Sequence, residues 1–310
     1  MADLRLGILG ISEGNGHPFS FASIINGYSA PDLAAAGWPV IYDYVRRRDP
    51  AEFGIFGAYV THAWTQEPQT TQKLCAAARI PNVVAAPAEL INAVDAVIIA
   101  RDDYENHLRL TEPFLEAGLP VFVDKPLTLS VDELARFYPY LQSGQLMSCS
   151  AMRYARELDE LKLNLQSYGD LKLVRAAVVN GWEKYGVHLL EAITSLIGPR
   201  FEWVQAAESN HMSVTLGTGG GPLVQIDALG STVVGFQLDL WGSAAASSHR
   251  ISDNFSMFRR MLWHFVESVK SKRPAIAPEE TIAIMKVLMA GQISARENRR
   301  VNLNELTLTV

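Results

Sequence analysis

The amino-acid sequence predicts an α/β protein of two parts, in which a doubly wound parallel sheet is followed by an α+β domain with a large open, mostly antiparallel sheet. Three observations predict this class. The chain has 310 residues, enough for two domains of ordinary size. Up to residue 125, short apolar runs alternate with segments of helical spacing, which is typical of parallel strands joined by helices. Over residues 126–310, runs that alternate apolar and polar residues with a period of two predict a half-buried antiparallel sheet.

Strands and helices alternate in the first predicted domain, residues 1–125. Ser20 is the expected cap of the first helix, Pro68 opens the second, and Gly118 ends the third. The predicted strands are residues 4–11, 57–64, 94–100 and 120–124, and the predicted helices are residues 20–28, 68–80 and 106–118. Residues 31–56 do not fit this alternation, so we expect an insertion between the first helix and the second strand.

The second predicted domain, residues 126–310, begins with a helix over residues 130–144, where Ser130 and Glu133 have the spacing of a capping box. Further helices are predicted at residues 156–169, 185–198, 257–271 and 278–297, and strands at residues 171–181, 201–209, 212–218, 222–229 and 233–242. The glycine-rich run 217–222 lies between two of these strands and is expected to form a hairpin turn rather than a phosphate cradle.

Composition and charge narrow the possible functions. The 27 basic and 33 acidic side chains argue against a general nucleic-acid or anionic-membrane binder. The sequence has no apolar run of the roughly 20 residues that a membrane span needs, and its acidic N-terminus does not resemble a signal peptide. Cys75 and Cys149 lie far apart and are expected to be reduced, so we expect a cytoplasmic protein. The histidines His62, His107 and His249 have no partners at metal-ligand spacing, and no metal site is predicted.

A glycine-rich loop follows the first predicted strand, in the run "LGILGISEGNGHPFS". The spacing G-x-G-x-x-G is absent, because Ser12 stands where the second glycine is expected. Gly10 can still form the first turn, and a longer turn precedes a helix entered through Pro18; its members are Ser12, Gly14, Asn15 and Gly16. Backbone amide groups at a helix N-terminus can bind phosphate without the standard spacing. A phosphate-binding loop and a plain turn therefore both remain open.

The run "EAGLPVFVDKPLTLSVDEL" carries a resemblance to a known family. Together with "VDAVIIA", "SAMRY", "YGVHLLEAI" and the closing helix–loop–helix pattern, it resembles the Gfo/Idh/MocA oxidoreductases, which include glucose–fructose oxidoreductase and inositol dehydrogenase. The resemblance implies a Rossmann-like nucleotide-binding domain at residues 1–125 and a domain for substrate and oligomerisation at residues 126–310. It further implies NAD or NADP as cofactor and hydride transfer to or from a sugar-like alcohol. A homodimer or tetramer that forms through the C-terminal sheet is also implied.

Lys125 is the first candidate catalytic residue, because it follows a strand whose carboxyl end should border the ligand crevice. A lysine there can hydrogen-bond a substrate hydroxyl and stabilise a developing alkoxide. The resemblance implies that His188 handles the proton near the nicotinamide. It also places an aspartate four residues earlier, where this chain has Lys184. Tyr185 or Lys184 could take the place of that acid, and Glu191 resembles a second acid of the family.

The predicted cofactor contacts also depart from the usual pattern. An acid at the end of the second strand normally holds the ribose hydroxyls, but here that strand ends in Thr65 and Gln66. Asp102 stands near the expected nicotinamide ribose, and Asp124 replaces the family's glutamate. These departures leave three functions open. One is a dehydrogenase, the second is a binding or regulatory protein with a degenerate nucleotide site, and the third is an enzyme that uses the cofactor without net redox change.

Overall fold

The computed structural model describes residues 3–233 and 235–308, and the chain divides into two compact units. Unit 1 consists of residues 1–125, 139–148 and 254–275, and unit 2 of residues 126–138, 149–253 and 276–310. The first change of unit falls at the predicted domain boundary, and two later segments of the chain belong to unit 1. The roles assigned to the two domains stay a prediction.

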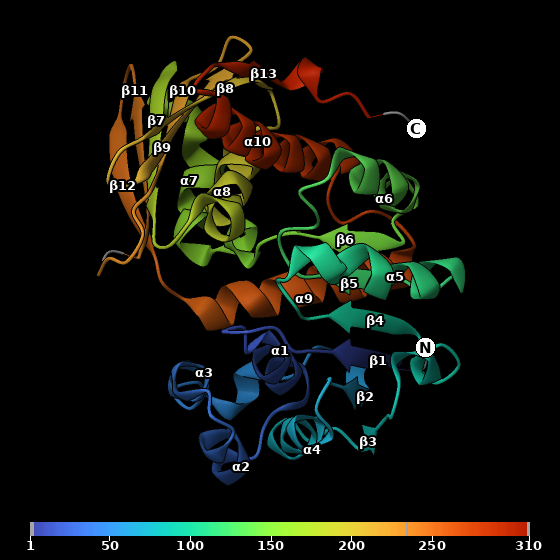
Figure 1. Ribbon diagram of the computed structural model, residues 1–310. Coiled ribbons are helices and arrows are strands. Elements are labelled where there is room, and N and C mark those ends of the chain that lie inside the picture. The colour runs from blue at the N-terminus through green and yellow to red at the C-terminus, as the bar shows by residue number, and fades with distance from the viewer. Residues whose placement is uncertain (1–2, 234, 309–310) are drawn as a thin grey trace. The chain divides into compact units, whose positions relative to one another are not determined.

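A six-stranded parallel sheet forms the centre of unit 1, with the strand order β3-β2-β1-β4-β5-β6 (Figure 1). Its strands are β1 (Leu4–Leu9), β2 (Ala58–Trp64), β3 (Asn82–Val83), β4 (Ala96–Ile99), β5 (Val121–Val123) and β6 (Leu146–Ser148). The reversal of strand order between β1 and β4 creates the crevice at which doubly wound sheets bind ligands. All four residues of β4 are buried, as expected for a strand covered on both faces.

Helices connect these strands or, in the case of α9, follow them in the chain and pack in the same unit. They are α1 (His17–Asn26), α2 (Ala30–Ala35), α3 (Pro39–Val45), α4 (Pro68–Ala77), α5 (His107–Glu116) and α9 (Asn254–Ser271), and α6 (Val131–Ser143) contributes residues to both units. The prediction that Ser20 caps the first helix is wrong. Helix α1 begins at His17, because Pro18 suits its first turn, and Ser20 lies fully buried inside the helix, where it accepts a hydrogen bond from the Tyr44 hydroxyl.

The segment predicted as an insertion, residues 31–56, forms α2, α3 and a short 3₁₀ turn over Pro50–Glu52. Helix α9 completes the apolar interior of unit 1, where Phe258 contacts Phe21 and Phe265 contacts Phe122 through their rings. Strand β6 and helix α9 lie far along the chain from residues 1–125, but both belong to unit 1.

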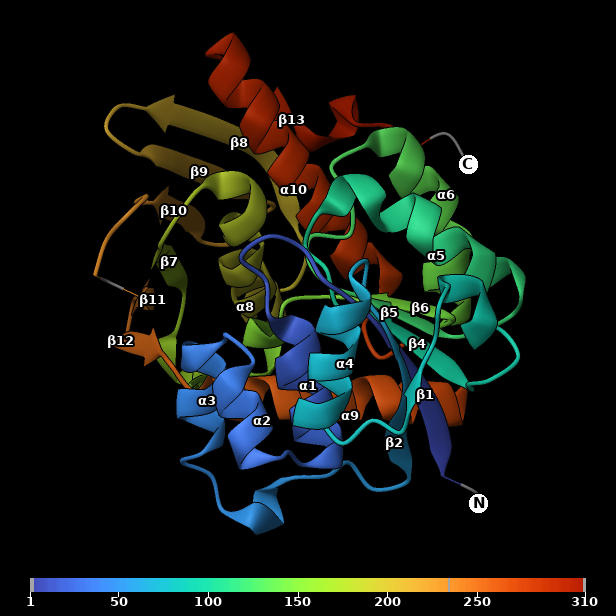
Figure 2. The same cartoon turned by 60° about the horizontal axis from the view of Figure 1, so that its bottom comes forward.

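Unit 2 contains a seven-stranded sheet with the order β12-β11-β7-β10-β9-β8-β13 (Figure 2). Its strands are β7 (Leu171–Val178), β8 (Phe201–Glu208), β9 (Met212–Thr218), β10 (Leu223–Ala228), β11 (Phe236–Gly242), β12 (Ala246–Ile251) and β13 (Val301–Asn302), and its helices are α7 (Asp159–Asn164), α8 (Val187–Ile197) and α10 (Pro278–Glu297). Among the strand pairs described in this seven-stranded sheet, only β7 and β10 are parallel, so the predicted mostly antiparallel sheet is confirmed. Residue 234, within the strand predicted over 233–242, lies outside the described residues.

One face of this sheet is covered, and the other carries the alternate residues of each strand. Helix α10 packs on β8 and helix α8 on β7, above fully buried side chains such as Ile226 and Leu238 (Figures 1 and 2). The run predicted as a hairpin turn connects the antiparallel strands β9 and β10, as expected. This arrangement leaves the loops at the ends of β7 and β10 beside the N-terminus of α8, where the candidate histidine lies.

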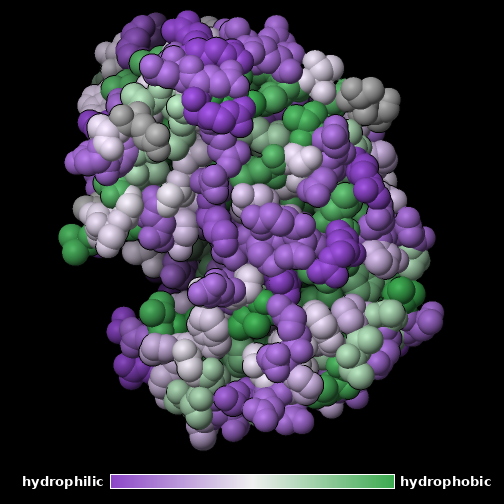
Figure 3. Space-filling model, in the orientation of Figure 1, coloured by the Kyte–Doolittle hydropathy of each residue, from purple (hydrophilic) through white to green (hydrophobic). Residues whose placement is uncertain are grey.

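On the face of the molecule that Figure 3 shows, hydrophobic residues form small groups among hydrophilic ones. None of the helices in residues 3–233 and 235–308 is both long and apolar enough to cross a membrane.

Candidate active site

The glycine-rich loop between β1 and α1 is fastened to the end of β2 by one side chain. The Gln66 amide accepts a hydrogen bond from the Ile11 N–H at 2.8 Å and donates one to the Ile11 carbonyl at 2.7 Å. Both backbone polar groups of Ile11 are thereby bound by a single side chain. Gln66 thus occupies, at the end of the second strand, the place where an acid would contact ribose hydroxyls.

A second side-chain contact joins the loop to the end of β4. The Ser12 hydroxyl donates to Asp102 at 2.7 Å and accepts from the Asp102 backbone N–H at 3.1 Å. The other oxygen of Asp102 lies 3.7 Å from Nζ of Lys125, whose side chain is only 5% exposed. The predicted residues Ser12, Asp102 and Lys125 therefore lie together at the carboxyl ends of β4 and β5.

The third contact joins the loop to the end of β5, where Asp124 is buried. Its Oδ2 atom accepts a hydrogen bond from the Asn15 amide at 3.0 Å and lies 2.5 Å from Nδ1 of His17. Burial alone would raise the pKa of Asp124, but the positive charge and hydrogen bond of His17, the charge of Lys125 and the Asn15 amide together hold this pKa far below its usual value. Asp124 is therefore an ionised carboxylate that holds the glycine-rich loop through Asn15 and His17.

Two glycines of the loop allow close packing, and one leaves the backbone open. A side chain at Gly10 would place its Cβ atom 2.3 Å from the Pro18 ring, and one at Gly16 would approach Trp38 to 2.6 Å. Gly14 has a φ of +73°, and nothing lies within 4 Å of its Cβ direction. The loop therefore presents uncovered backbone at Gly14, which fits the close approach of a ligand phosphate.

Thr65 lies at the end of β2 and is 2% exposed. Its hydroxyl donates to the Glu67 carbonyl at 2.8 Å and lies 2.8 Å from the Thr71 hydroxyl. These contacts close the first turn of α4. They show how the residue stabilises the helix start, and its predicted contact with a cofactor stays a prediction.

In unit 2, His188 lies in the first turn of α8, and its imidazole is held on three sides. Nδ1 is 2.6 Å from the Ser150 hydroxyl, and the rings of Tyr185 and Phe236 meet the imidazole edge to face at centroid distances of 5.4 Å and 5.2 Å. The predicted pair Tyr185 and His188 is thus in contact. Ser150 was not predicted as a site residue, although the sequence places it in the motif "SAMRY".

An ion-pair network lies one turn further along α8. Glu191 is 1% exposed, and its carboxylate accepts a hydrogen bond from Nε of Arg153 at 2.6 Å; Arg153 also contacts Glu280 of α10 at 2.5 Å. Burial raises the pKa of Glu191, and Arg153 and the Ser150 backbone N–H offset only part of this effect. The two carboxylates raise the pKa of Arg153, so the guanidinium stays charged. Glu191 therefore fixes the turn that contains Ser150 and Arg153 to α8.

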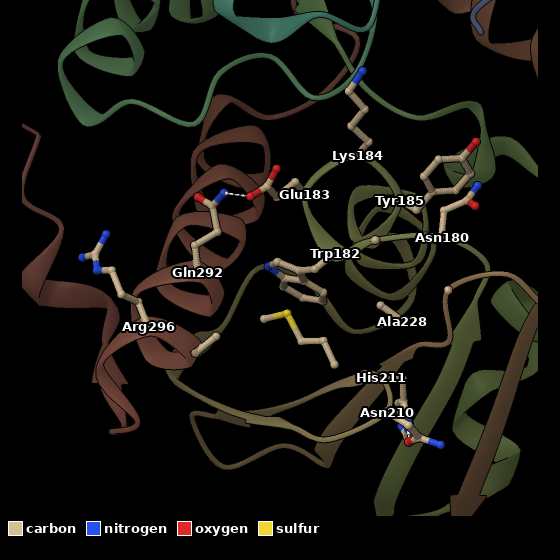
Figure 4. A pocket seen from close by; sticks show the side chains of 14 residues that line it. Asn180, Trp182, Glu183, Lys184, Tyr185, Asn210, His211, Ala228, Gln292 and Arg296 are labelled. Atoms are coloured by element: carbon tan, nitrogen blue, oxygen red, sulfur yellow. Dashed lines mark hydrogen bonds between the residues drawn. The ribbon is translucent and has the colours of Figure 1, made fainter.

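The residues before His188 form a π turn over Trp182–Gly186 at the rim of a hollow of about 770 Å³ (Figure 4). Trp182 donates from Nε1 to the Leu288 carbonyl at 3.0 Å, and Glu183 accepts a hydrogen bond from Gln292 at 2.7 Å. In Figure 4 the side chains of Lys184 and Tyr185 extend away from Trp182. Helix α10 and the π turn are thus joined by Trp182 and Glu183, and Lys184 does not take part in this junction.

The structure groups the predicted residues in two sets. Ser12, Asn15, Asp102, Asp124 and Lys125 gather around the loop in unit 1, and Tyr185 contacts His188 in unit 2. Sequence analysis missed His17, Gln66, Ser150 and Arg153. For Gln66, its place directly after a predicted strand was a signal. For His17 the sequence gives no such signal, because its partner Asp124 is 107 residues away. Among residues 3–233 and 235–308 there is no group of three or more His, Cys, Asp or Glu side chains that could hold a metal ion.

One segment of the chain matches the model of a known protein family. Residues 44–150 match the Gfo/Idh/MocA family model, which is described as an oxidoreductase family with an NAD-binding Rossmann fold. The resemblance to the Gfo/Idh/MocA oxidoreductases is confirmed. The Gfo/Idh/MocA match includes β2, β3, β4, β5 and β6, and thus the positions of Gln66, Asp102 and Lys125.

Solved Gfo/Idh/MocA structures share the whole fold. Apo scyllo-inositol dehydrogenase from Lactobacillus casei superposes with a TM-score of 0.77 at 15% identity, covering 98% of this chain and 99% of that one. The same enzyme with bound NAD(H) and scyllo-inositol gives 0.77 at 16%, covering 97% and 99%. Myo-inositol 2-dehydrogenase from Lactobacillus plantarum also gives 0.77 at 16%, again covering 97% and 99%. No curated protein sequence matches the chain. At these identities the likeness establishes the fold.

Proposed function

We propose that this protein is a nicotinamide-dependent oxidoreductase that transfers hydride to or from a sugar, a polyol or a related small hydroxy compound. The observation that carries the proposal is the position of Lys125. It is a buried cation at the carboxyl end of β5, in the segment that matches an oxidoreductase family with an NAD-binding Rossmann fold. A structural neighbour with the same fold over nearly its whole length holds NAD(H) and scyllo-inositol.

The loop between β1 and α1 supports the binding of a dinucleotide through its backbone. Gly14 leaves a stretch of peptide uncovered immediately before the N-terminus of α1, where backbone dipoles favour a phosphate. The adenosine ribose has weaker support, because Gln66 contributes an amide where an acid is usual and its polar groups bind Ile11. The nicotinamide, when bound, supplies or accepts the hydride. We leave NAD and NADP as equal candidates.

Lys125 is the group of unit 1, and His188 the group of unit 2, for which we propose a chemical role. The ammonium of Lys125 hydrogen-bonds the substrate oxygen and stabilises negative charge that develops on it. Asp102, 3.7 Å from Nζ, orients the lysine side chain. Nδ1 of His188 faces Ser150. In this proposal, His188 therefore contacts a hydroxyl group of the substrate through Nε2. Tyr185 and Lys184 are the neighbouring groups able to exchange a proton with solvent.

A second candidate function is a binding or regulatory protein with the same fold. It is favoured by the contacts of Gln66, Asp102 and Asp124, which all bind the chain's own loop. The replacement of the family's aspartate by Lys184 points in the same direction, because a cation there disfavours a positively charged imidazole one turn away. The two functions differ in whether hydride is transferred.

We also propose that the protein is a homodimer or tetramer that associates through the uncovered face of the sheet in unit 2. The strand register aligns one row of residues across this face. The row consists of Ala246, Trp241, Leu173, Leu223, Gly217 and Trp203. Trp241 is 40% exposed and Leu223 is 43% exposed. An aligned apolar row on an open sheet supports self-association.

The function is tested by titrating the purified protein with NADH and NADPH, followed by nucleotide fluorescence, and by screening a panel of polyols for nucleotide reduction. We expect binding of one nucleotide and turnover of at least one polyol. Lys125→Met should reduce turnover by about a hundredfold and keep nucleotide binding, whereas Lys172→Met, at an exposed position paired only weakly with Asp170, should change neither. Nucleotide binding with no turnover of any polyol would favour the regulatory function, and no binding would contradict both the cofactor and the reaction.

A further inference from the structure

The Ser150 hydroxyl has two neighbours among its described contacts. Ser150 caps the 3₁₀ turn Ala151–Tyr154, and its Oγ atom accepts a hydrogen bond from the Met152 N–H at 3.2 Å. The second neighbour is Nδ1 of His188, at 2.6 Å. A serine hydroxyl has one proton to donate and two lone pairs. Since Met152 is itself a donor, the acceptor that these contacts offer to the hydroxyl proton is Nδ1.

We propose that Ser150 is a positioning residue that fixes neutral His188 in the tautomer with its proton on Nε2. A neutral imidazole has one donor and one acceptor nitrogen, so an Nδ1 that accepts from Ser150 leaves Nε2–H as the donor. In the opposite tautomer, Nδ1–H would donate to Ser150, and the hydroxyl proton would need another acceptor. The described contacts of Ser150 Oγ, Met152 and His188, provide none.

The turn that carries Ser150 is fixed firmly enough for this role. The backbone N–H of Ser150 donates to the Glu191 carboxylate, which also accepts a hydrogen bond from Nε of Arg153 at 2.6 Å. The turn is therefore attached to α8 at two positions one helical turn apart, through His188 and through Glu191. Ser150 is 2% exposed and Glu191 1%, so water has little access to either contact. Such fixed, buried partners are what keep a histidine in one tautomer.

This inference rests on the proposed function where it concerns chemistry. A neutral His188 with its proton on Nε2 offers a hydrogen-bond donor to a substrate oxygen, while the lone pair on Nδ1 accepts the hydrogen bond from Ser150. Such an imidazole cannot accept a proton at Nε2. His188 therefore holds the substrate oxygen as a donor, and the proton that an alcohol loses on oxidation passes to solvent water rather than to Nε2.

The tautomer can be read directly from long-range ¹H–¹⁵N spectra of the nitrogen-labelled protein without ligand, with His188→Gln used to assign the signals. At a pH where the imidazole is neutral, we expect an unprotonated Nδ1 and a protonated Nε2. Ser150→Ala should give averaged nitrogen shifts typical of mixed tautomers, and Ser150→Thr, which keeps the hydroxyl, should restore the wild-type pattern. Ser167→Ala, at an exposed serine, is the control.

The spectra decide the proposal independently of activity. A wild-type Nδ1 that carries the proton, or a Ser150→Ala spectrum equal to that of the wild type, would overturn it. Thermal unfolding of each variant shows whether the fold is kept, and Ser150→Thr separates the loss of the hydroxyl from the loss of packing. If a polyol is turned over, kcat/KM should fall about tenfold in Ser150→Ala and recover in Ser150→Thr. If no polyol is turned over, the proposed function fails but the tautomer result stands.

Discussion

Nδ1 of His17 lies 2.5 Å from Oδ2 of Asp124, so the start of the first helix and the end of the fifth strand of unit 1 are joined by a buried ion pair. The Asp124 side chain is 2% exposed and that of His17 is 21% exposed. The residue next to Lys125 is therefore committed to holding the glycine-rich loop in place. The carboxylates of Asp124 and Asp102 both lie close to Lys125, and their negative charges interact favourably with the lysine ammonium.

Asp124 should make the protein less stable in acid. Folding lowers the pKa of Asp124 below its usual value of 3.8, so its contribution to the free energy of unfolding is complete above about pH 5 and is lost as the pH falls toward the lower, folded-state pKa. Chemical denaturation between pH 7 and pH 3 should show this loss in the wild type and a smaller loss in Asp124→Asn. Equal pH dependence of the two proteins would contradict the ion pair.

His17→Ala should destabilise the protein by about 3 kcal/mol at pH 7, because it leaves a buried carboxylate without its main partner. The double variant His17→Ala/Asp124→Asn should recover part of this loss, since the unpaired charge is then removed. Urea denaturation of the wild type, both single variants and the double variant measures the coupling. Additive effects would show that the two side chains do not interact.

Removal of the Gln66 amide should loosen the glycine-rich loop. In Gln66→Ala the backbone N–H and carbonyl of Ile11 each lose a hydrogen bond, and we expect faster amide hydrogen exchange over residues 11–16 and a loss of about 1 kcal/mol of stability. Hydrogen-exchange mass spectrometry measures the first effect. Gln72→Ala, at an exposed position of α4, serves as the control and should leave exchange in the loop unchanged.

Glu191 and Glu280 both contact Arg153, but their substitution should differ in cost. The Glu191 side chain is 1% exposed, and Glu191→Gln should cost about 3 kcal/mol because the buried guanidinium loses its more deeply buried carboxylate. Glu280 is 24% exposed, and water can replace part of its contact, so Glu280→Gln should cost about 1 kcal/mol. Urea denaturation ranks the two, and a reversed order would mean that Glu280 is the main counter-ion.

The uncovered sheet face can be tested by a pair of polar substitutions. Trp241→Ser with Leu223→Ser removes two large exposed side chains of the apolar row and should convert the proposed homodimer or tetramer into smaller species in light scattering. Leu163→Ser, at a residue 75% exposed on α7, is the matched control. A wild-type protein that is monomeric at all concentrations would refute the association.

Strands β1, β2, β4 and β5 of unit 1 could be predicted because each is an apolar run bounded by a loop, and the family resemblance gave the same order. The sequence did not reveal β3 and β6, which have two and three residues, because so short a run has no recognisable period. It also could not show that residues 254–275 belong to unit 1, since an amphipathic helix does not specify its partner.

Single residues of the site were predictable where a local pattern marks them. Lys125 follows a buried strand directly and is bounded by a proline, so its place at a strand end could be read from the sequence. Ser150 and His17 depend on partners 38 and 107 residues away, and no spacing rule connects them. The same holds for the two ends of the Arg153–Glu191 pair.

The three-part composition of unit 1 has a consequence for synthesis on the ribosome. Its sixth strand and the helix that carries Phe258 and Phe265 are translated after residue 138 and after residue 253. The nascent N-terminal sheet must therefore wait, with Phe21 and Phe122 incompletely covered, until most of unit 2 has left the exit tunnel. A gene fragment that stops at Lys125 encodes a sheet without its edge strand, and chaperone binding during translation is expected at that stage.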